Sequence, residues 1–270
     1  MISVLLSVYE KENPIFFSEA LDSIYTNQTR KPDEVVLVED GPLTKELYDA
    51  IDAFEKRCPC LVVHRFEKNQ QLGRALAKGV EICSGDLIAR MDTDDVALEN
   101  RLEEQEAYML AHPEVDVCGG WIEEFDTNDE TFRQIKKMPE HHEDIYQYAK
   151  YRNPVNHMTV MLRKDAVLAV GNYEHFPLLE DYKLWMKLLA HGSKFYNVPK
   201  VLVRMRSGNN VYSRRGGLEY TKRYMGLRKY QKSLGLLHGF EYPKVIVLTL
   251  GMTASGSFLR KIFYRKVLRK

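Results

Sequence analysis

The 270-residue chain has few cysteines, no long apolar run and no internal repeat. Its cysteines, Cys58, Cys60, Cys83 and Cys118, lack the paired spacing of a zinc site, so we expect reduced structural thiols. No stretch reaches the roughly 18 apolar residues that a membrane-spanning helix needs. The apolar residues 2–8 are too short for a secretory signal and lack a basic flank, so we expect a cytoplasmic protein.

Acidic residues are scarce in the last quarter of the chain. Residues 200–270 hold 17 of the 39 basic residues but only two of the 38 acidic ones, Glu219 and Glu241. Residues 1–199 therefore carry the opposite excess, with 22 basic and 36 acidic side chains. Such a split predicts a polyanionic partner for the C-terminal segment, either a membrane surface or a nucleic acid. A solvated face of an ordinary helix would explain only part of it.

Apolar residues in the same segment favour the membrane over nucleic acid. Residues 245–258 are uncharged, and residues 260–270 combine six cations with five apolar or aromatic residues: Ile262, Phe263, Tyr264, Val267 and Leu268. This composition is typical of a segment that lies in the membrane interface. Each basic residue near an anionic surface contributes about 1 kcal/mol. We therefore expect a peripheral protein on the anionic inner leaflet of the plasma membrane, and no nucleic-acid partner.

The first 115 residues alternate between apolar runs and longer amphipathic stretches. We expect strands and helices, respectively, at residues 2–8, 34–38, 61–63 and 87–90, and at residues 14–27, 44–56 and 72–83. This alternation predicts βαβ units and a mostly parallel, doubly wound α/β sheet. Ligands bind such sheets beyond the carboxyl ends of the strands, where Tyr9-Glu10 and Glu39-Asp40-Gly41 lie.

The pattern changes after residue 115, where strands and helices no longer alternate strictly. We expect strands and helices, respectively, at residues 115–125, 131–138, 159–162 and 195–203, and at residues 141–151, 179–191 and 216–236. The turn Asp126-Thr-Asn-Asp predicts that residues 131–138 pair with residues 115–125 as a hairpin.

Three carboxylates follow the fourth expected strand, in the segment Arg90-Met-Asp-Thr-Asp-Asp. Asp92, Asp94 and Asp95 would repel one another at the end of a buried strand unless a cation neutralised them. Carboxylate oxygens suit Mg²⁺ or Mn²⁺, which keep coordination positions for phosphate oxygens. We therefore interpret the cluster as a divalent-cation site. The alternative is that Asp94 or Asp95 caps a helix that begins near Leu98.

Four motifs occur in order along residues 1–205: Ser3-Val-Leu-Leu-Ser-Val-Tyr9, Val38-Glu39-Asp40-Gly41, Asn69-Gln-Gln-Leu-Gly73-Arg74-Ala75 followed by Ala89-Arg90-Met-Asp92-Thr-Asp94-Asp95, and Glu180-Asp181-Tyr182. Together they resemble the family 2 glycosyltransferases with the GT-A fold, which build bacterial surface polysaccharide. The second motif departs from the family's more common Asp-Asp-Gly-Ser. Asp40 is therefore a firmer match than Glu39.

The resemblance implies a GT-A fold with three parts. A nucleotide-binding donor half would cover about residues 1–115 and an acceptor half about residues 116–205. A basic helical extension would cover residues 206–270.

The resemblance also implies roles for individual residues on the donor side. Asp40 would accept the N3 proton of uracil, with Ser7 and Tyr9 in the same cleft. Asp92 would contact the ribose and neighbour the metal, and Asp94 would hold the Mn²⁺ or Mg²⁺ ion. The cation would neutralise the charge that grows on the departing diphosphate.

Asp181 is the expected general base for the acceptor hydroxyl. A carboxylate opposite the leaving group supports direct displacement with inversion, as in inverting glycoside hydrolysis. General-base help of this kind is typically worth about 10²–10⁴-fold in rate. The alternative is that Glu180 and Asp181 stabilise a helix N-terminus through its dipole, and both roles can coexist.

Weaker signals come from four further residues. Arg74 could assist at the diphosphate or be a solvated helix residue. His157 could face the acceptor, alongside Glu180, or be a hydrogen-bonded structural histidine. Arg214 and Arg215 could close over the donor phosphates, because arginine binds phosphate bidentately, or belong to the membrane face of the extension.

The sequence thus predicts a metal-dependent inverting glycosyltransferase that uses a nucleotide-sugar donor, expected to be a UDP-sugar, and a lipid-linked or glycan acceptor. One alternative is a sugar-phosphate nucleotidyltransferase, but the glycine-rich basic loop that such an enzyme needs after its first strand is absent from Ser7-Val-Tyr-Glu-Lys11. Another is a non-catalytic scaffold that binds membrane or polymer.

Overall fold

The computed structural model describes residues 1–127, 129–207 and 217–254. Strands and helices alternate in its first half: β1 (Ile2–Val8), α1 (Pro14–Ile24), β2 (Glu34–Glu39), α2 (Lys45–Glu55), β3 (Leu61–Arg65), α3 (Leu72–Ile82) and β4 (Leu87–Arg90). β1 pairs with β2 and β4, β2 pairs with β3, and all three pairs are parallel. The predicted alternation and parallel pairing are therefore confirmed.

Helices cover both faces of these strands. Val4 and Leu6 of β1 pack in an apolar cluster with side chains of α1 and α2, whereas Leu5 packs in a second cluster with side chains of α3. Parallel strands that are covered on both faces read as nearly continuous apolar runs, which explains residues 2–8. The chain is doubly wound α/β, as predicted.

Beyond β4 the sheet continues with mixed pairing. The elements are β5 (Val96–Ala97), α4 (Arg101–Ala111), β6 (Val115–Asp126), β7 (Asp129–Lys136), α5 (His142–Ala149), β8 (Met161–Arg163), α6 (Lys164–Ala169), α7 (Glu180–Ala190) and β9 (Lys194–Arg206). The strand order is β3-β2-β1-β4-β8-β6-β9-β5, with β7 paired to β6. β8 runs antiparallel to both β4 and β6, while β6 and β9 are parallel.

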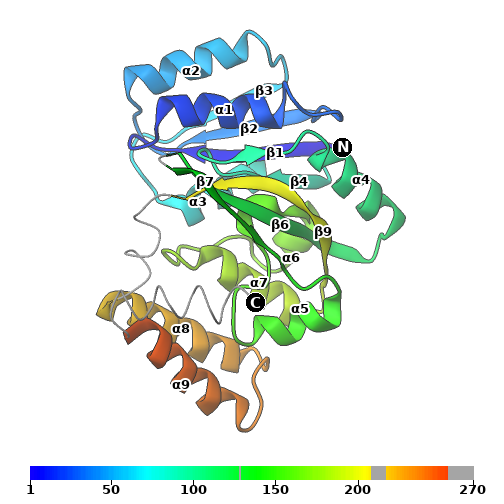
Figure 1. Cartoon of the computed structure of the whole chain (residues 1–270), viewed down its shortest axis with the longest axis vertical. Helices are drawn as coiled ribbons and strands as arrows, with labels where there is room; N and C mark the ends of the chain where they lie inside the picture. The colour runs from blue at the N-terminus through cyan, green and yellow to red at the C-terminus, as the bar shows by residue number, and fades with distance from the viewer. Residues whose placement is uncertain (128, 208–216, 255–270) are drawn as a thin grey trace.

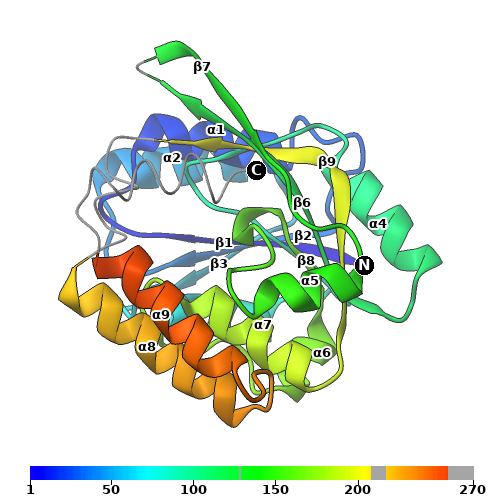
Figure 2. The ribbon, with the colours of Figure 1, turned by 60° about the horizontal axis from the view of Figure 1, so that its bottom comes forward.

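The predicted hairpin is confirmed. β7 pairs antiparallel with β6, and Figure 2 shows this hairpin extending away from the body of the molecule. The prediction missed β5 and α6, because two and six residues are too few for a periodic pattern.

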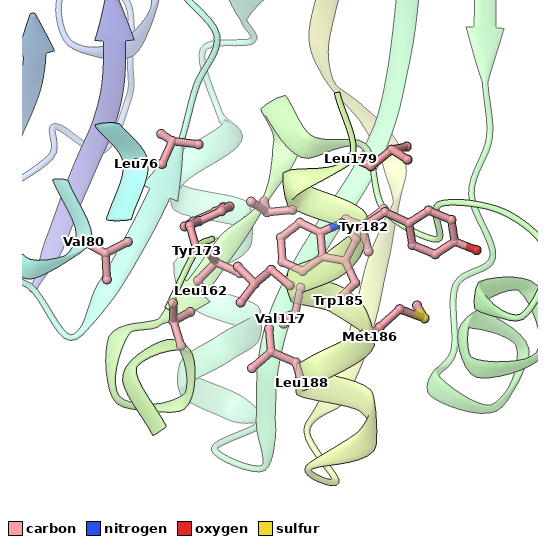
Figure 3. Close-up of a cluster of buried hydrophobic side chains, with 14 of the residues drawn as sticks. Leu76, Val80, Val117, Leu162, Tyr173, Leu179, Tyr182, Trp185, Met186 and Leu188 are labelled. Atoms are coloured by element: carbon pink, nitrogen blue, oxygen red, sulfur yellow. The ribbon is translucent and has the colours of Figure 1, made fainter. Parts of the chain in front are cut away.

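α7 forms the core of the second half. Trp185 and Tyr182 are buried within it, and Figure 3 shows Trp185 surrounded by Leu162, Val117 and Leu188. Buried residues on nearly all sides of α7 therefore fix the position of its first turn, where the predicted base motif lies.

α8 (Leu218–Ser233) and α9 (Glu241–Ala254) form a helical pair at the end of the molecule opposite α2 (Figure 1). α8 matches the helix predicted over residues 216–236. In the described part of the chain, every helix is too short or too polar to cross a membrane. Arg214, Arg215 and the cations of residues 260–270 lie outside the described residues.

The four cysteines are free thiols, as predicted. Cys58, Cys83 and Cys118 are buried, and burial raises the pKa of each to about 12. Their role is packing.

Candidate active site

The expected donor-binding residues lie at or near the carboxyl ends of the parallel strands. Ser7 lies one residue before the end of β1, beside Val38 of β2, and Asp40 follows β2 directly. The strand order reverses direction at β1, because β2 and β4 flank it on either side. Such a switch point opens a crevice at the carboxyl ends of the strands, which is where an α/β sheet binds its ligand.

Asp40 is held in a buried turn. It is 5% exposed, and its Oδ1 accepts a hydrogen bond of 2.5 Å from the backbone N–H of Gln70. Burial raises the pKa of Asp40, while the hydrogen bonds from Gln70 and Gln71 oppose this. Gly41 has a φ of +94°, and a Cβ there would lie 2.8 Å from the Asn69 nitrogen, so the turn requires glycine.

Tyr9 and Arg74 are exposed near the same strand ends. Tyr9 follows β1 and is 40% exposed, and Arg74 lies in the first turn of α3. Glu39 is buried instead, and the Arg65 Nε donates to both of its carboxylate oxygens at 3.0–3.1 Å. Arg65 thus occupies the carboxylate of Glu39, and Asp40 is the carboxylate of the motif that remains as the candidate donor contact.

Asp92 and Asp94 line a cavity of about 470 Å³ at the end of β4. Burial raises the pKa of Asp94 to about 7, and repulsion from Asp92 and Glu12 adds to the shift. Asp95 is 2% exposed and accepts a hydrogen bond of 2.8 Å from the backbone N–H of Arg206. The helix after the cluster is capped at Asn100, so the alternative that Asp94 or Asp95 caps it is wrong.

A buried arginine lies beside this cluster. Arg90 is 2% exposed, and its Nη2 donates to Asp92 Oδ1. Its Nε and Nη1 have no hydrogen-bond partner among the described residues. Burial of a charged guanidinium costs free energy unless negative charge lies beside it. The carboxylate of Asp92 supplies that charge to Arg90, which also lines the cavity.

The oxygen donors in this cavity fit Mg²⁺ or Mn²⁺. Asp92 and Asp94 offer carboxylate oxygens, which hard cations prefer. In residues 1–127, 129–207 and 217–254, no group of three histidine, cysteine, aspartate or glutamate side chains converges as a complete metal site. An ion here would therefore need further oxygens, such as those of a diphosphate.

Arg206 contacts the loop that carries the carboxylates of Asp92, Asp94 and Asp95 (the acidic loop). Its Nε donates to the backbone oxygen of Asp94 at 3.0 Å, and its guanidinium lies 3.8 Å from the ring centroid of Phe16. Its Nη2 pairs with Glu19. The end of β9 thus joins the acidic loop to α1.

Glu180 and Asp181 occupy the first turn of α7 and line the same cavity. Asp181 Oδ2 accepts a hydrogen bond from Asn153 Nδ2, and Oδ1 accepts one of 2.7 Å from the Tyr182 backbone N–H. Burial, followed by repulsion from Asp181, raises the pKa of Glu180 to about 7. Both carboxylates thus lie at the helix N-terminus, and both also face the cavity.

His157 lines the cavity and is hydrogen-bonded. Its Nε2 lies 2.9 Å from the hydroxyl of Tyr173, and its ring meets Trp185 edge-on. Burial and the charge of Arg90 lower the pKa of His157 well below its ordinary value, so the ring is neutral. This is the hydrogen-bonded arrangement expected of a structural histidine.

The structure thus brings five of the predicted site residues to one cavity: Asp92, Asp94, His157, Glu180 and Asp181. The other described ones lie outside its lining: Ser7, Tyr9, Asp40 and Arg74. Sequence patterns missed Arg206 and gave no role of their own to Arg90, inside a quoted motif, or to Asn153, which begins the segment Asn153-Pro-Val-Asn-His157 that could face the acceptor.

Two family models match the chain. The first, described as glycosyl transferase family 2, matches residues 3–168. The second, described as glycosyl transferase family group 2, matches residues 87–264.

Curated relatives match over nearly their whole length. The amylovoran biosynthesis glycosyltransferase AmsE of Erwinia amylovora is 38% identical, over 92% of this chain and 93% of the relative. The UDP-Gal:alpha-D-GlcNAc-diphosphoundecaprenol beta-1,3-galactosyltransferase of Escherichia coli is 36% identical, over 99% of this chain and 96% of the relative.

Among solved structures, the S. aureus TarS 1-349 complex with UDP-GlcNAc superposes with a TM-score of 0.69 at 15% sequence identity. The match covers 98% of this chain and 76% of that one. At this identity the likeness establishes the fold, which is of the GT-A type.

Proposed function

Because the chain belongs to the family 2 glycosyltransferases of the surface-polysaccharide type, we propose that it is a metal-dependent, inverting enzyme that transfers sugar from a UDP-sugar to a lipid-linked acceptor. One observation carries the proposal. The carboxylates of Asp92 and Asp94 and the carboxylate of Asp181 line a single cavity, although they come from the loop after β4 and from α7.

Asp94 and Asp92 would hold a Mn²⁺ or Mg²⁺ ion. Bound there, the ion would supply positive charge to the diphosphate leaving group. The high pKa of Asp94 supports this assignment, because a cation in the cavity would relieve the repulsion that raises it. Arg90 orients the Asp92 carboxylate through its hydrogen bond.

Asp181 would take the proton from the attacking acceptor hydroxyl. Asn153 and the Tyr182 backbone hold its two oxygens, so the side chain is fixed before the acceptor arrives. A general base must lie in a fixed position within reach of the proton that it takes, and these hydrogen bonds supply that fixed position. A single displacement assisted by this carboxylate inverts the configuration at the transferred carbon.

The donor base would lie in the crevice beside Asp40, next to Ser7 and Tyr9. The name of the E. coli relative specifies UDP-galactose, which supports uracil as the base. The same name specifies a diphosphoundecaprenol-linked sugar as acceptor, which supports a lipid-linked acceptor and work at the inner face of the plasma membrane.

Isothermal titration calorimetry with UDP tests the donor site. We expect UDP to bind with Mn²⁺ and to lose at least tenfold in affinity without it, because the diphosphate would then face unscreened carboxylates. Asp94→Ala should abolish the metal dependence, whereas Asp52→Ala on the exposed side of α2 should not. Metal-independent binding would remove Asp94 from the site.

Product analysis separates this function from nucleotidyl transfer. A glycosyltransferase releases UDP and forms a glycosidic bond. A nucleotidyltransferase instead joins a sugar phosphate to the nucleotide of UTP and releases pyrophosphate. Appearance of labelled nucleotide-sugar from sugar phosphate and UTP would contradict the proposal. A scaffold would give neither product.

A further inference from the structure

The outward face of α9 is apolar, which is unusual for a surface helix. Val247 is 68% exposed, Leu248 47% and Leu250 42%. Surface helices normally turn such residues toward the core and their polar residues toward water. Three large aliphatic side chains on one exposed helix indicate a contact surface.

The inward face of α9 carries threonines instead. Thr249 and Thr253 are each 1% exposed, and Thr249 Oγ1 accepts a hydrogen bond of 3.1 Å from Arg228 Nε. Thr253 Oγ1 donates to the Thr249 backbone oxygen at 2.8 Å. Beside the buried Val245, two buried positions of α9 are therefore polar while aliphatic side chains face outward, which partly inverts the usual distribution.

Polar contacts prevent α9 from rotating its apolar face inward. Lys150 Nζ lies 2.7 Å from Glu241 Oε1 at the start of the helix. Arg228, which is 1% exposed, also donates to the Tyr151 backbone oxygen at 2.6 Å. Rotation would take Thr249 away from the buried Arg228 guanidinium and break the hydrogen bond between them.

The surroundings of this face are basic and aromatic. Phe240, just before α9, is 92% exposed, and Lys244 is exposed within the helix. Lys229 and Lys232 are exposed on the neighbouring α8. Exposed aliphatic and aromatic side chains on a helical pair that also carries exposed lysines suit the boundary of an anionic lipid bilayer.

We infer that the face of α9 formed by Val247, Leu248 and Leu250 (the outer face) inserts into an anionic lipid bilayer. This inference rests on the proposed function, because a lipid-linked acceptor requires the enzyme at a membrane. Exposed lysines on the same helical pair match anionic headgroups, which favours a bilayer over a protein partner.

The same helical pair lines the cavity. Tyr220 and Tyr224 of α8 and Met252 of α9 contribute to the cavity wall (Figure 2 shows the two helices side by side). Insertion of the outer face would therefore place at the bilayer the helical pair that forms part of the cavity wall. A diphosphate-linked sugar could then reach it without leaving the membrane.

Vesicle flotation with the full-length chain tests this surface. The probes are vesicles of phosphatidylcholine alone and of phosphatidylcholine mixed with phosphatidylglycerol. We expect the protein to float with the mixed vesicles, and the Val247→Ser/Leu248→Ser/Leu250→Ser variant to bind them at least about tenfold more weakly. These positions are exposed, so circular dichroism should show an unchanged fold.

A matched control replaces exposed apolar residues elsewhere. Leu110→Ser/Ile135→Ser removes two side chains that are 71% and 50% exposed on α4 and β7. This variant should float like the wild type. Equal flotation of the triple variant and the wild type, or no flotation of either, would overturn the inference. A dimer that the triple variant abolishes, without vesicle binding, would overturn it in favour of a second copy of the chain.

Metal-dependent hydrolysis of UDP-sugar separates the two proposals. The triple variant should retain this activity, because Val247, Leu248 and Leu250 do not line the cavity. Flotation without hydrolysis or transfer would contradict the proposed function and leave the membrane surface standing. Hydrolysis without flotation would do the reverse.

Discussion

The carboxylate of Asp181 has two separate roles, a structural one as a hydrogen-bonded group at a helix N-terminus and a proposed catalytic one as a base. Asp181→Asn keeps the size of the side chain and an oxygen for the Tyr182 N–H. We therefore expect the fold and UDP affinity to survive while transfer falls by about 10²–10⁴-fold. Steady-state kinetics with saturating donor measures the loss. Turnover close to that of the wild type would leave Asp181 with the helix role alone.

Asp94 makes the metal-free protein sensitive to pH. Its folded pKa of about 7 lies above the unfolded value, so the folded state holds a proton that the unfolded state releases. Its contribution to stability is present below about pH 4 and is lost as the pH rises to about 7. Asp94→Asn should remove this loss and stabilise the metal-free protein by up to about 4 kcal/mol at pH 8.

Urea denaturation in the presence of a chelator measures this difference across pH. The gap between variant and wild type should open between about pH 4 and pH 7 and stay constant above. Added Mn²⁺ should stabilise the wild type and not the variant. A gap that is equally large at pH 4 would contradict the assignment to this carboxyl group.

Arg206 offers a test of how the acidic loop is held. Removing its contacts to Asp94 and Glu19 should loosen the loop, and loss of such outer contacts typically weakens a metal site about 10-fold or more. Arg206→Ala should therefore raise the Mn²⁺ concentration needed for half-maximal activity with little effect on KM for the acceptor.

Arg204 supplies the matched control. Arg204 and Arg206 both lie 4.8 Å from the Phe125 ring, but Arg204 pairs with Glu123 rather than with the acidic loop. Arg204→Ala should leave the Mn²⁺ dependence unchanged. Equal effects of the two substitutions would mean that stacking on Phe125, not the loop contact, matters.

At the scale of single residues, the carboxylates of the candidate site could be predicted from the sequence, whereas the residues that hold them in place could not. Asp92, Asp94 and Asp181 stand in short motifs whose spacing is visible in one dimension. Arg206 acts on a loop more than a hundred residues earlier in the chain, and no local pattern encodes that pairing. Asn153 is likewise joined to Asp181 only by the fold.

Two elements meet at Gly73, where α3 begins. A Cβ at this position would lie 2.6 Å from the backbone oxygen of Glu174, in the segment that leads into α7. The backbone there cannot swing aside as a side chain could. We expect Gly73→Ala to destabilise the protein by about 1–3 kcal/mol, more than the roughly 1 kcal/mol that alanine gains in a helix.

Gly226 within α8 is the control for this prediction. The nearest atom to a Cβ there is the Phe176 Cζ at 3.7 Å, an ordinary contact. Gly226→Ala should therefore stabilise the protein by up to about 1 kcal/mol. Thermal denaturation of both variants decides the matter, and stabilisation by both would show that the α3 contact relaxes at no cost.

Element types were predictable where periodicity was long, and their partners were less so. The four parallel strands and α1 to α3 follow from alternation, since each βαβ unit closes locally. β8 inserts between β4 and β6, and β9 pairs with β6 across about 80 residues, and neither is visible in the segments themselves. The inverted face of α9 is a property of packing against Arg228, which sequence alone does not place.

For the molecule as a whole, the basic extension and α9 should contribute to membrane binding in different ways. A truncation at residue 244, which composition alone suggests, would remove Val245, Thr249 and Thr253, all about 1% exposed, and leave Arg228 without a partner on α9. A cut after Ala254 keeps that contact and removes six cations. The second truncation is therefore the informative one.

Cations near an anionic surface contribute about 1 kcal/mol each, and salt screens them, whereas apolar insertion is much less sensitive to salt. Deleting residues 255–270 should therefore weaken flotation with phosphatidylglycerol vesicles most at low salt and flatten its salt dependence, while UDP-sugar hydrolysis persists. The triple serine variant should instead weaken flotation at every salt concentration. If the deletion abolished binding at low and high salt alike, the outer face of α9 would have no independent hold on the bilayer, and the charge of the extension alone would keep this enzyme at its acceptor.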